Sequence, residues 1–355
     1  MVRMFWLELF SRRPERTTDS DSGQLASRPV SQLASWPASL TLFAACAASA
    51  SPFPTRDQNP LLAGFGLPTP MPARIDSSDQ WSFAADFNWG SSAIVQANAG
   101  ESPRESLVVD GETRELRLSA ARGFAKRFAF QLQLPYRYTG AGSLDNFIDN
   151  WHDFFGLPQG ARPSLPVDAI HIRYRRDGAT LIDLRSAQSG LADLHAAAGY
   201  QWLATQSTSI AAWLDLKLPT GDADKLTGSG AADASLLVAA EHRFSERWSM
   251  FGQVGLSYLG KGDLLPDQQR DAVGSALLGV DIRVWRGLGF KLQLDAHTGA
   301  FDRTHLDYLG DATLLTIGGD YRFASGWLLD IGVSEDVAVD AAPDVVFVLG
   351  VRRRH

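Results

Sequence analysis

The stretch from residue 128 to residue 138, FAFQLQLPYRY, places a large apolar side chain at every second position. This alternation is the period of a β-strand whose two faces meet different surroundings. Its eleven residues exceed the usual strand of about 5–6 residues. A chain built from such segments must either pack its apolar faces together or turn them toward lipid.

The same alternation recurs along most of the chain. Twelve segments carry it, an even number, as in single-chain bacterial outer-membrane barrels. They are 81–89, 113–120, 128–138, 191–204, 209–218, 236–244, 248–258, 275–284, 290–298, 313–323, 327–333 and 345–351. Pro135 removes one donor from the third segment, so we expect a bulge or weak pairing there.

The connectors between these segments alternate in length. Those after even-numbered segments are short: 121–126, 205–208, 245–247, 285–289 and 324–326. Those after odd-numbered segments are longer: 90–112, 139–190, 219–234, 259–274, 299–312 and 334–344. A transmembrane barrel predicts this rule, because its periplasmic turns are tight and its extracellular loops are long. A soluble β-sandwich or lipocalin-like barrel predicts no such rule.

The two faces of the segments also favour a membrane barrel. The apolar face carries Trp and Tyr near the segment ends, as the aromatic girdles of a bilayer-spanning barrel would. The opposite face carries charges of both signs. We therefore predict an all-β fold, a transmembrane antiparallel up-and-down β-barrel of about 12 strands, with one amphipathic helix in a long extracellular loop. A soluble two-sheet protein with an apolar core would explain neither the loops nor the aromatic ends.

Composition excludes two other classes. The sequence has no internal run of 18 or more apolar residues, which argues against a helical membrane protein. Its net charge is −7 and no basic cluster interleaves with aromatic residues, so nucleic acid is not an expected partner.

The one strongly apolar stretch near the start is typical of a secretory signal, whereas residues 1–27 mix both charges and fit no export element well. The apolar stretch 33–54 includes Ala48-Ser49-Ala50, which predicts signal cleavage before Ser51. Lipidation at Cys46 is the rival interpretation. Cys46 is the only cysteine, so an exported chain cleaved at Ser51 would have neither disulfides nor thiolate metal sites. The predicted organisation is a leader at 1–50, a proline-rich segment at 51–80 and the barrel at 81–355.

Two motifs carry resemblances to known families. RDQNPLLAGFGLPTP at 56–70 and DNFIDNWHDFFGLPQGAR at 145–162 resemble an uncharacterised bacterial outer-membrane β-barrel family, known as a domain of unknown function. LKLPTGD at 216–222, followed by GSGAAD at 228–233, more weakly resembles outer-membrane transporters of the meta-pathway phenol-degradation type. The resemblance implies outer-membrane localisation, with outer-membrane lipid and the barrel assembly machinery as partners. It supplies no catalytic residue.

The long loop 139–190 contains a predicted helix. Its apolar residues from Leu144 to Phe155 fall at helical spacing, Ser143 is a candidate N-cap, and Gly156 is a candidate stop. One interpretation is a constriction at the barrel mouth, formed by Trp151, His152, Phe154 and Phe155. The other is a helix packed on neighbouring loops with a solvated acidic face. The following stretch, 169–186, reads as a hairpin above the membrane.

The lumen is the second candidate site. Its predicted inward charges are Arg137, Asp193, His195, Asp215, Lys217, Asp281, Arg283, Lys291, Asp295, Asp320 and Arg322. They either neutralise one another in a filled lumen or line a polar path. The proline-rich stretch 59–72 either plugs the lumen from the periplasmic side or is a mobile leader. We expect a mostly filled lumen, with any gate near Arg137.

Three functions are compatible with these features. A channel or transporter for an unidentified small solute is the first, and a structural, receptor or assembly barrel is the second. A lipid hydrolase is the third, but His195 and Asp193 share a face with no neighbouring serine, as a nucleophilic site would need. The sequence indicates no cofactor and no metal centre.

Overall fold

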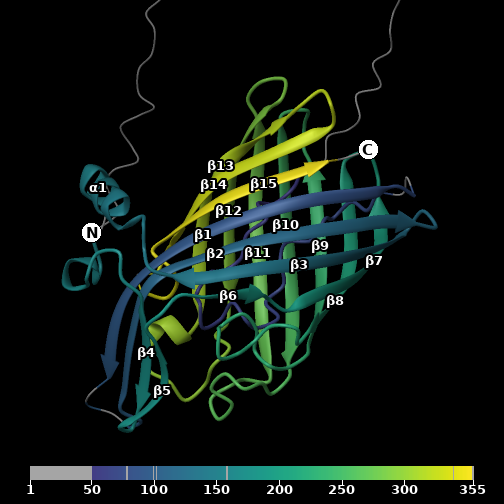
Figure 1. The fold of residues 1–355 in the computed structure, drawn as a ribbon. Coiled ribbons are helices and arrows are strands. Elements are labelled where there is room, and N and C mark those ends of the chain that lie inside the picture. Colours follow the sequence, from purple (N-terminus) through teal and green to yellow (C-terminus); the bar gives the residue numbers. More distant parts are fainter. Residues whose placement is uncertain are drawn as a thin grey trace, which may run out of the picture. The chain divides into compact units, whose positions relative to one another are not determined.

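The computed structural model describes residues 50–76, 79–98, 100, 102–156, 159–338 and 340–353. Residues 1–49, which hold nearly all of the predicted leader and Cys46, and the side chain of Phe155 lie outside the described residues. Within the described part of the chain, twelve antiparallel strands form a closed ring (Figure 1). They are β1 (Trp81–Asn98), β2 (Glu105–Phe124), β3 (Phe128–Gly140), β7 (Leu194–Ala204), β8 (Thr208–Leu218), β9 (Asp233–Arg243), β10 (Trp248–Leu259), β11 (Ala272–Arg283), β12 (Leu288–His297), β13 (Ala312–Arg322), β14 (Trp327–Asp336) and β15 (Val345–Arg353).

The ring follows the order of the chain. Each strand pairs with its neighbour in sequence, β3 pairs with β7, and the last strand closes on the first from Phe83↔Arg353 to Ser91↔Val345. This is the predicted up-and-down topology. It leaves no unpaired edge in the wall, as a barrel in a bilayer requires.

The outer surface of the ring is apolar. Large hydrophobic side chains point outward from most of the wall and are 41–62% exposed, among them Phe83, Leu118, Leu134, Leu236, Val254, Leu278, Ile317 and Ile331. Their alternate neighbours point inward, and many of them are buried polar residues, such as Gln133, Thr316 and Asp330. This arrangement is inverted relative to a water-soluble barrel, so the exterior is a lipid-facing belt and the barrel spans the membrane.

One predicted connector is wrong. Residues 90–112, expected as a loop, instead prolong both flanking strands, so that β1 has 18 residues and β2 has 20. The reason is pairing above the barrel: β4 (His171–Arg176) joins the outer end of β2, and β5 (Ala179–Leu184) completes the predicted hairpin. Ile94, Leu107 and Val109 are fully buried between these layers. The other connectors keep the short and long alternation.

The expected irregularity at Pro135 is present. Gln133 lies opposite His195, whereas Tyr136 lies opposite Leu191 in β6 (Gln188–Leu191), so two residues of β3 face three residues of the partner. That is the signature of a β-bulge. The extra residue turns Asp193 into the lumen, where it is 3% exposed.

The loop helix forms where predicted, as α1 (Asp145–Phe155). Gly156 ends it in the left-handed region with φ 66°, as expected of a C-cap glycine. Ser143 is not the N-cap. Leu144 holds that position without a side-chain cap, and the Glu112 carboxylate accepts the Ser143 and Leu144 N–H groups instead. Two 3-10 helices, η1 (Arg162–Ser164) and η2 (Asp307–Leu309), complete the loops. No helix in the described ranges is long and apolar enough to cross a membrane.

Candidate functional site

The lumen is occupied by the chain's own N-terminal segment, residues 50–76, which we call the plug. The plug carries six prolines, at 52, 54, 60, 68, 70 and 72. Proline has no N–H, so an irregular proline-rich segment leaves fewer backbone donors to satisfy inside a barrel. Nearly every described plug residue is buried. The lumen is therefore closed by a separate segment of the chain, and not only by side chains of the barrel strands.

The plug rises through the barrel and descends again. Ser51 and Phe53 contact β12, where the Lys291 ammonium donates to the Ser51 carbonyl at 3.0 Å. Asn59 lies at the extracellular end, where its side chain donates to the Tyr308 carbonyl of η2 at 2.8 Å. Arg74 lies at the opposite end and donates to the Thr205 carbonyl in the tight β7–β8 turn. The plug therefore spans the lumen in both directions before β1 begins.

Inward glutamines satisfy the plug backbone. Gln293 on β12, Gln253 on β10 and Gln201 on β7 accept the N–H groups of Phe53, Met71 and Ile75, at 2.7, 2.7 and 2.6 Å. A glutamine side chain both accepts and donates, so it can replace a neighbouring strand as the partner of an irregular backbone. Trp213 on β8 adds an indole N–H bond to the Pro72 carbonyl at 3.0 Å.

Lys217 on β8 is the centre of one docking point. Its ammonium donates to the Gly64 carbonyl of the plug at 2.9 Å and to Asp193 at 2.8 Å. It also pairs with Asp233 at 3.0 Å, and the side chain is 1% exposed. Asp233 in turn accepts the plug's Gly66 N–H at 2.7 Å. A buried cation needs several such partners, and the plug supplies one of them.

The glycines of the plug fit this docking point sterically. A Cβ on Gly64 would lie 2.8 Å from the backbone carbon of Gly228, and one on Gly66 would lie 2.6 Å from the Asp233 Cβ. Both separations are shorter than real side chains tolerate. The two motifs that resemble known families, GFG of the plug and GSGAAD of the β8–β9 loop, therefore touch each other.

A second docking point surrounds Glu115 on β2. Three guanidinium groups meet its carboxylate: Arg56 of the plug at 3.3 Å, Arg137 of β3 at 2.5 Å, and Arg117 of β2. Arg137 also donates to the Ala63 carbonyl of the plug at 2.7 Å. Arg56 shapes the plug itself, because it donates to its Ala63 and Leu67 carbonyls.

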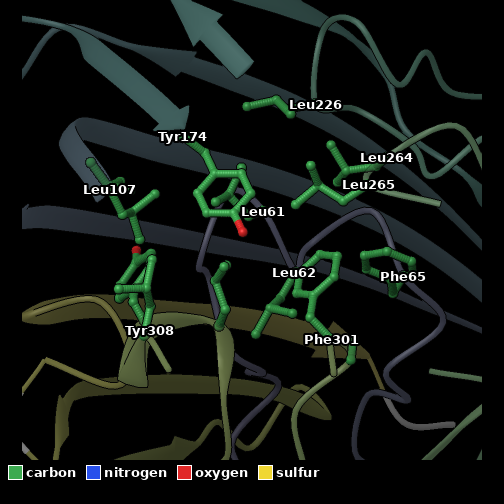
Figure 2. Close-up of a cluster of buried hydrophobic side chains, with 14 of the residues drawn as sticks. Leu61, Leu62, Phe65, Leu107, Tyr174, Leu226, Leu264, Leu265, Phe301 and Tyr308 are labelled. Carbon is green, nitrogen blue, oxygen red and sulfur yellow. The ribbon is translucent and has the colours of Figure 1, made fainter. Parts of the chain in front are cut away.

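The apolar tip of the plug enters the extracellular loops. Leu61, Leu62 and Phe65 are fully buried in a cluster formed with residues of four loop regions (Figure 2). The Phe65 ring meets Phe301 edge-on, with 5.4 Å between ring centroids. The loops thus form an apolar cap over the lumen, and the tip of the plug is part of the core of that cap.

A narrow cavity separates the plug from the wall. It measures about 40 Å³ and is lined by Arg56 and Asp57 of the plug and by Gln253, Asp295 and His297 of the wall. A water molecule needs about 10–15 Å³ of such volume. The cavity therefore has room for a few waters and not for a solute of metabolite size while the plug is in place.

The eleven predicted lumen residues all belong to inner-face positions, but they form separate groups. Arg137, Lys217 and Lys291 contact the plug directly. The others pair along the wall: Asp193 with Lys217, His195 with Asp215 at 2.8 Å, Asp295 with Gln293, and Asp281 and Asp320 with Arg283 and Arg322. The last group stands beside the short turns, where its two carboxylates pair with its two guanidinium groups.

Sequence reasoning missed several residues of the site: Arg56, Gly64, Gly66, Glu115 and Trp213. Glu115 and Trp213 lie on the inner face of predicted strands, so the alternation could have identified them. Arg56 and the two glycines lie in a stretch with no strand or helix period. Their role follows only from what stands opposite them in the lumen.

The predicted loop constriction is wrong in position. α1 lies outside the ring of strands (Figure 1). Phe147 packs on Phe347, an outward residue of β15, with ring centroids 5.9 Å apart. Trp151 and Phe154 are 38% and 82% exposed, His152 is buried, and the side chain of Phe155 is outside the described residues. An amphipathic pattern predicts that a helix has an apolar and a polar face, but it does not predict which surface the apolar face contacts. The acidic residues near His152 form no metal cluster among the described residues.

The chain is similar to one protein family and to several barrels of known structure. A family model described as "Protein of unknown function (DUF3187)" matches residues 33–355. The COG4313 outer membrane channel from Pseudomonas putida F1 is similar over 79% of this chain and 99% of its own, with 16% identity and a TM-score of 0.53. The NanC porin covers 78% of this chain and 100% of its own, at 9% identity and TM-score 0.44. The match to the Ralstonia pickettii toluene transporter TbuX covers 79% of this chain and 90% of the transporter, with 11% identity and a TM-score of 0.40. No protein with a curated description matches.

Proposed function

This chain belongs to the DUF3187 family, and we propose that it is an outer-membrane channel for a small solute, closed by its own N-terminal plug. The observation that carries the proposal is the plug itself. A barrel with a purely structural role can fill its lumen with side chains from its strands. Here the wall encloses a separate segment whose removal would leave a path lined by charged and polar groups.

The chemistry of the inner wall supports a polar path. Lys217, Asp193, Asp233, Arg137 and Glu115 are held together in the closed state partly by plug carbonyl and N–H groups. Charged rings of this kind set the selectivity of pores once water enters. The Pseudomonas putida barrel that shares this fold is itself described as an outer membrane channel.

The alternative is a barrel that never opens, with a structural or receptor role. The two proposals differ in whether the plug leaves its position. For a lipid hydrolase, the lumen histidines His195 and His297 each bond a carboxylate that could orient a base, Asp215 at 2.8 Å and Asp57 at 3.0 Å, but neither bonds a serine or threonine hydroxyl among the described residues. A hydrolase would need a histidine that bonds its nucleophile.

The test is single-channel recording in planar bilayers with a matched pair of variants. Arg56→Gln and Arg117→Gln each remove one positive charge from beside Glu115. Only Arg56→Gln also removes the bonds that shape the plug. We expect wild-type protein to open rarely, Arg56→Gln to open far more often, and Arg117→Gln to resemble wild type.

Two results would count against a plugged channel. If all three proteins seal the bilayer at every voltage and exclude small sugars in liposome swelling, the barrel does not conduct. If the two variants open equally, the charge at Glu115 controls conductance and the plug does not. A heat-modifiable gel shift confirms in each case that the barrel is folded.

A further inference from the structure

The loop helix α1 presents a partly exposed aromatic face. Phe147, Trp151 and Phe154 are spaced i, i+4 and i+7, which places them on one face of the helix. They are 50%, 38% and 82% exposed. The neighbouring face, with Ile148 at 1% and His152 at 6%, is the one that packs on the rest of the loop.

This aromatic face lies at the level of the outer aromatic girdle. Phe147 packs on Phe347, and Phe347 is the ladder partner of Trp89 on β1 and of Val333 on β14. The Trp89 ring lies under the Arg114 guanidinium at 4.5 Å, the arrangement of an amphipathic girdle residue. The helix face therefore continues the lipid-facing belt where the belt meets the headgroups.

Several polar contacts hold α1 in this orientation. The Glu112 carboxylate accepts the Leu144 N–H at 2.7 Å at the start of the helix. Arg162 ties the first turn to the barrel rim, because it bonds Asp145 at 3.1 Å and Asp344 at 2.9 Å. Trp151 bonds Glu335, an outward residue near the end of β14. The exposure of the aromatic face is thus fixed by the fold.

We propose that α1 lies in the outer interface of the bilayer with its aromatic face among the lipid acyl chains. The partner is lipid, and apolar burial is the attraction. Interfacial helices usually carry Lys and Arg on the polar face, whereas α1 carries Asp149 and Asp153 there. Attraction to anionic headgroups therefore contributes little, and the helix is anchored by its aromatic residues and by the barrel it is tethered to.

The experiment uses spin labels in the full-length protein reconstituted into phosphatidylcholine vesicles. Cys46 is the only cysteine, so a Cys46→Ser background allows single labelling. The labelled variants are Phe154→Cys on the aromatic face, Asp153→Cys on the adjacent exposed polar face, and Leu349→Cys on the outer wall as a lipid reference. Collision with oxygen reports lipid, and collision with a water-soluble nickel chelate reports water.

We expect the label at 154 to resemble the label at 349, with several-fold lower nickel accessibility than the label at 153. Adding about 0.5 M salt, which screens exposed charges, should leave that ratio unchanged, because attraction to charged headgroups does not hold the aromatic face in the bilayer. Equal nickel accessibility at 153 and 154 would overturn the proposal. The measurement needs no conductance, so its failure leaves the proposed channel function untouched, and a sealed channel leaves this result intact.

Discussion

The steric fit of Gly64 allows the plug to be loosened without changing the barrel wall. In the docked plug, a Cβ at this position would lie 2.8 Å from the Gly228 backbone carbon, 2.9 Å from its oxygen and 3.1 Å from the Ser229 nitrogen. These are backbone atoms of the β8–β9 loop, which cannot rotate away as a flexible side chain can. Gly64→Ala therefore opposes the docked state specifically, because the clash disappears when the plug leaves.

The magnitude follows from the cost of overpacking. Forcing one extra methyl group into a well-packed site typically costs about 1–3 kcal/mol. A free-energy change of about 1.4 kcal/mol is a tenfold change in an equilibrium constant. Gly64→Ala should thus raise the ratio of undocked to docked plug by about 5- to 150-fold. If the wild-type channel is open about 0.1% of the time, a value within the range of minor states in proteins, the variant should be open visibly more often.

The assay is the open fraction of single channels in planar bilayers, compared with a glycine of no steric consequence. Gly100 lies in the connector between β1 and β2, and a Cβ there would meet nothing within 4 Å. Gly100→Ala thus makes the same chemical change without a clash. We expect it to match wild type, with both variants showing the wild-type heat-modifiable gel shift.

An unchanged open fraction in folded Gly64→Ala would refute the reasoning. It would mean either that the loop yields at no cost or that undocking at this point does not open the lumen. An increase that Gly100→Ala shares would equally refute it, because the effect would then come from glycine replacement in general.

Two further predictions concern buried charges. Lys217→Met leaves Asp193 and Asp233 without their shared cation and should lower the free energy of unfolding by about 3–5 kcal/mol, measured from the gel shift in urea. Lys225→Met, at a half-exposed ion pair, should change the free energy of unfolding by less than about 1 kcal/mol. Burial raises the pKa of the Asp344 carboxyl to about 7, although Arg162 opposes the rise. The folded chain therefore holds this proton more tightly than the unfolded chain, so docking of the loop that carries α1 should weaken as the pH rises from about 4 to 7. Hydrogen exchange in α1 should increase over that pH window, and Asp344→Asn should remove the dependence.

The barrel was predictable because lipid imposes a simple rule. An outward side chain in a bilayer must be apolar, whatever its neighbours are, so residues such as Leu132 and Leu134 alternate with inward polar ones. The rule ends where the membrane ends. Above the membrane, Ile94 and Leu107 lie on the extended ends of β1 and β2 and are buried in the apolar cluster of the extracellular loops instead of facing lipid. The alternation expected for a lipid-facing strand therefore placed the end of the first strand too early and the start of the second strand too late.

The position of the plug and of α1 was less predictable for a different reason. The plug has no period, and its partners Gln201, Gln253 and Gln293 are single residues on three separate strands. Nothing local in the sequence connects them. For α1 the amphipathic pattern was clear, but the choice between lumen and lipid was decided by the contact of Phe147 with Phe347, a residue far away in the sequence. Long-range complementarity of this kind is not encoded in the hydrophobic period.

Two kinds of plug contact differ in what opening would cost. The polar contacts at Lys217 and Arg137 involve buried charges, and water entering an open lumen would replace the lost plug partners. That exchange makes their net contribution to closure modest. The tip is different, because Leu61, Leu62 and Phe65 are fully buried in the cap. Each buries apolar area worth about 1.5–3 kcal/mol, or about 5–9 kcal/mol together as an upper estimate. Water cannot replace that contribution, so the barrier to opening lies mainly in the extracellular cap and only secondarily at the charged groups that line the path.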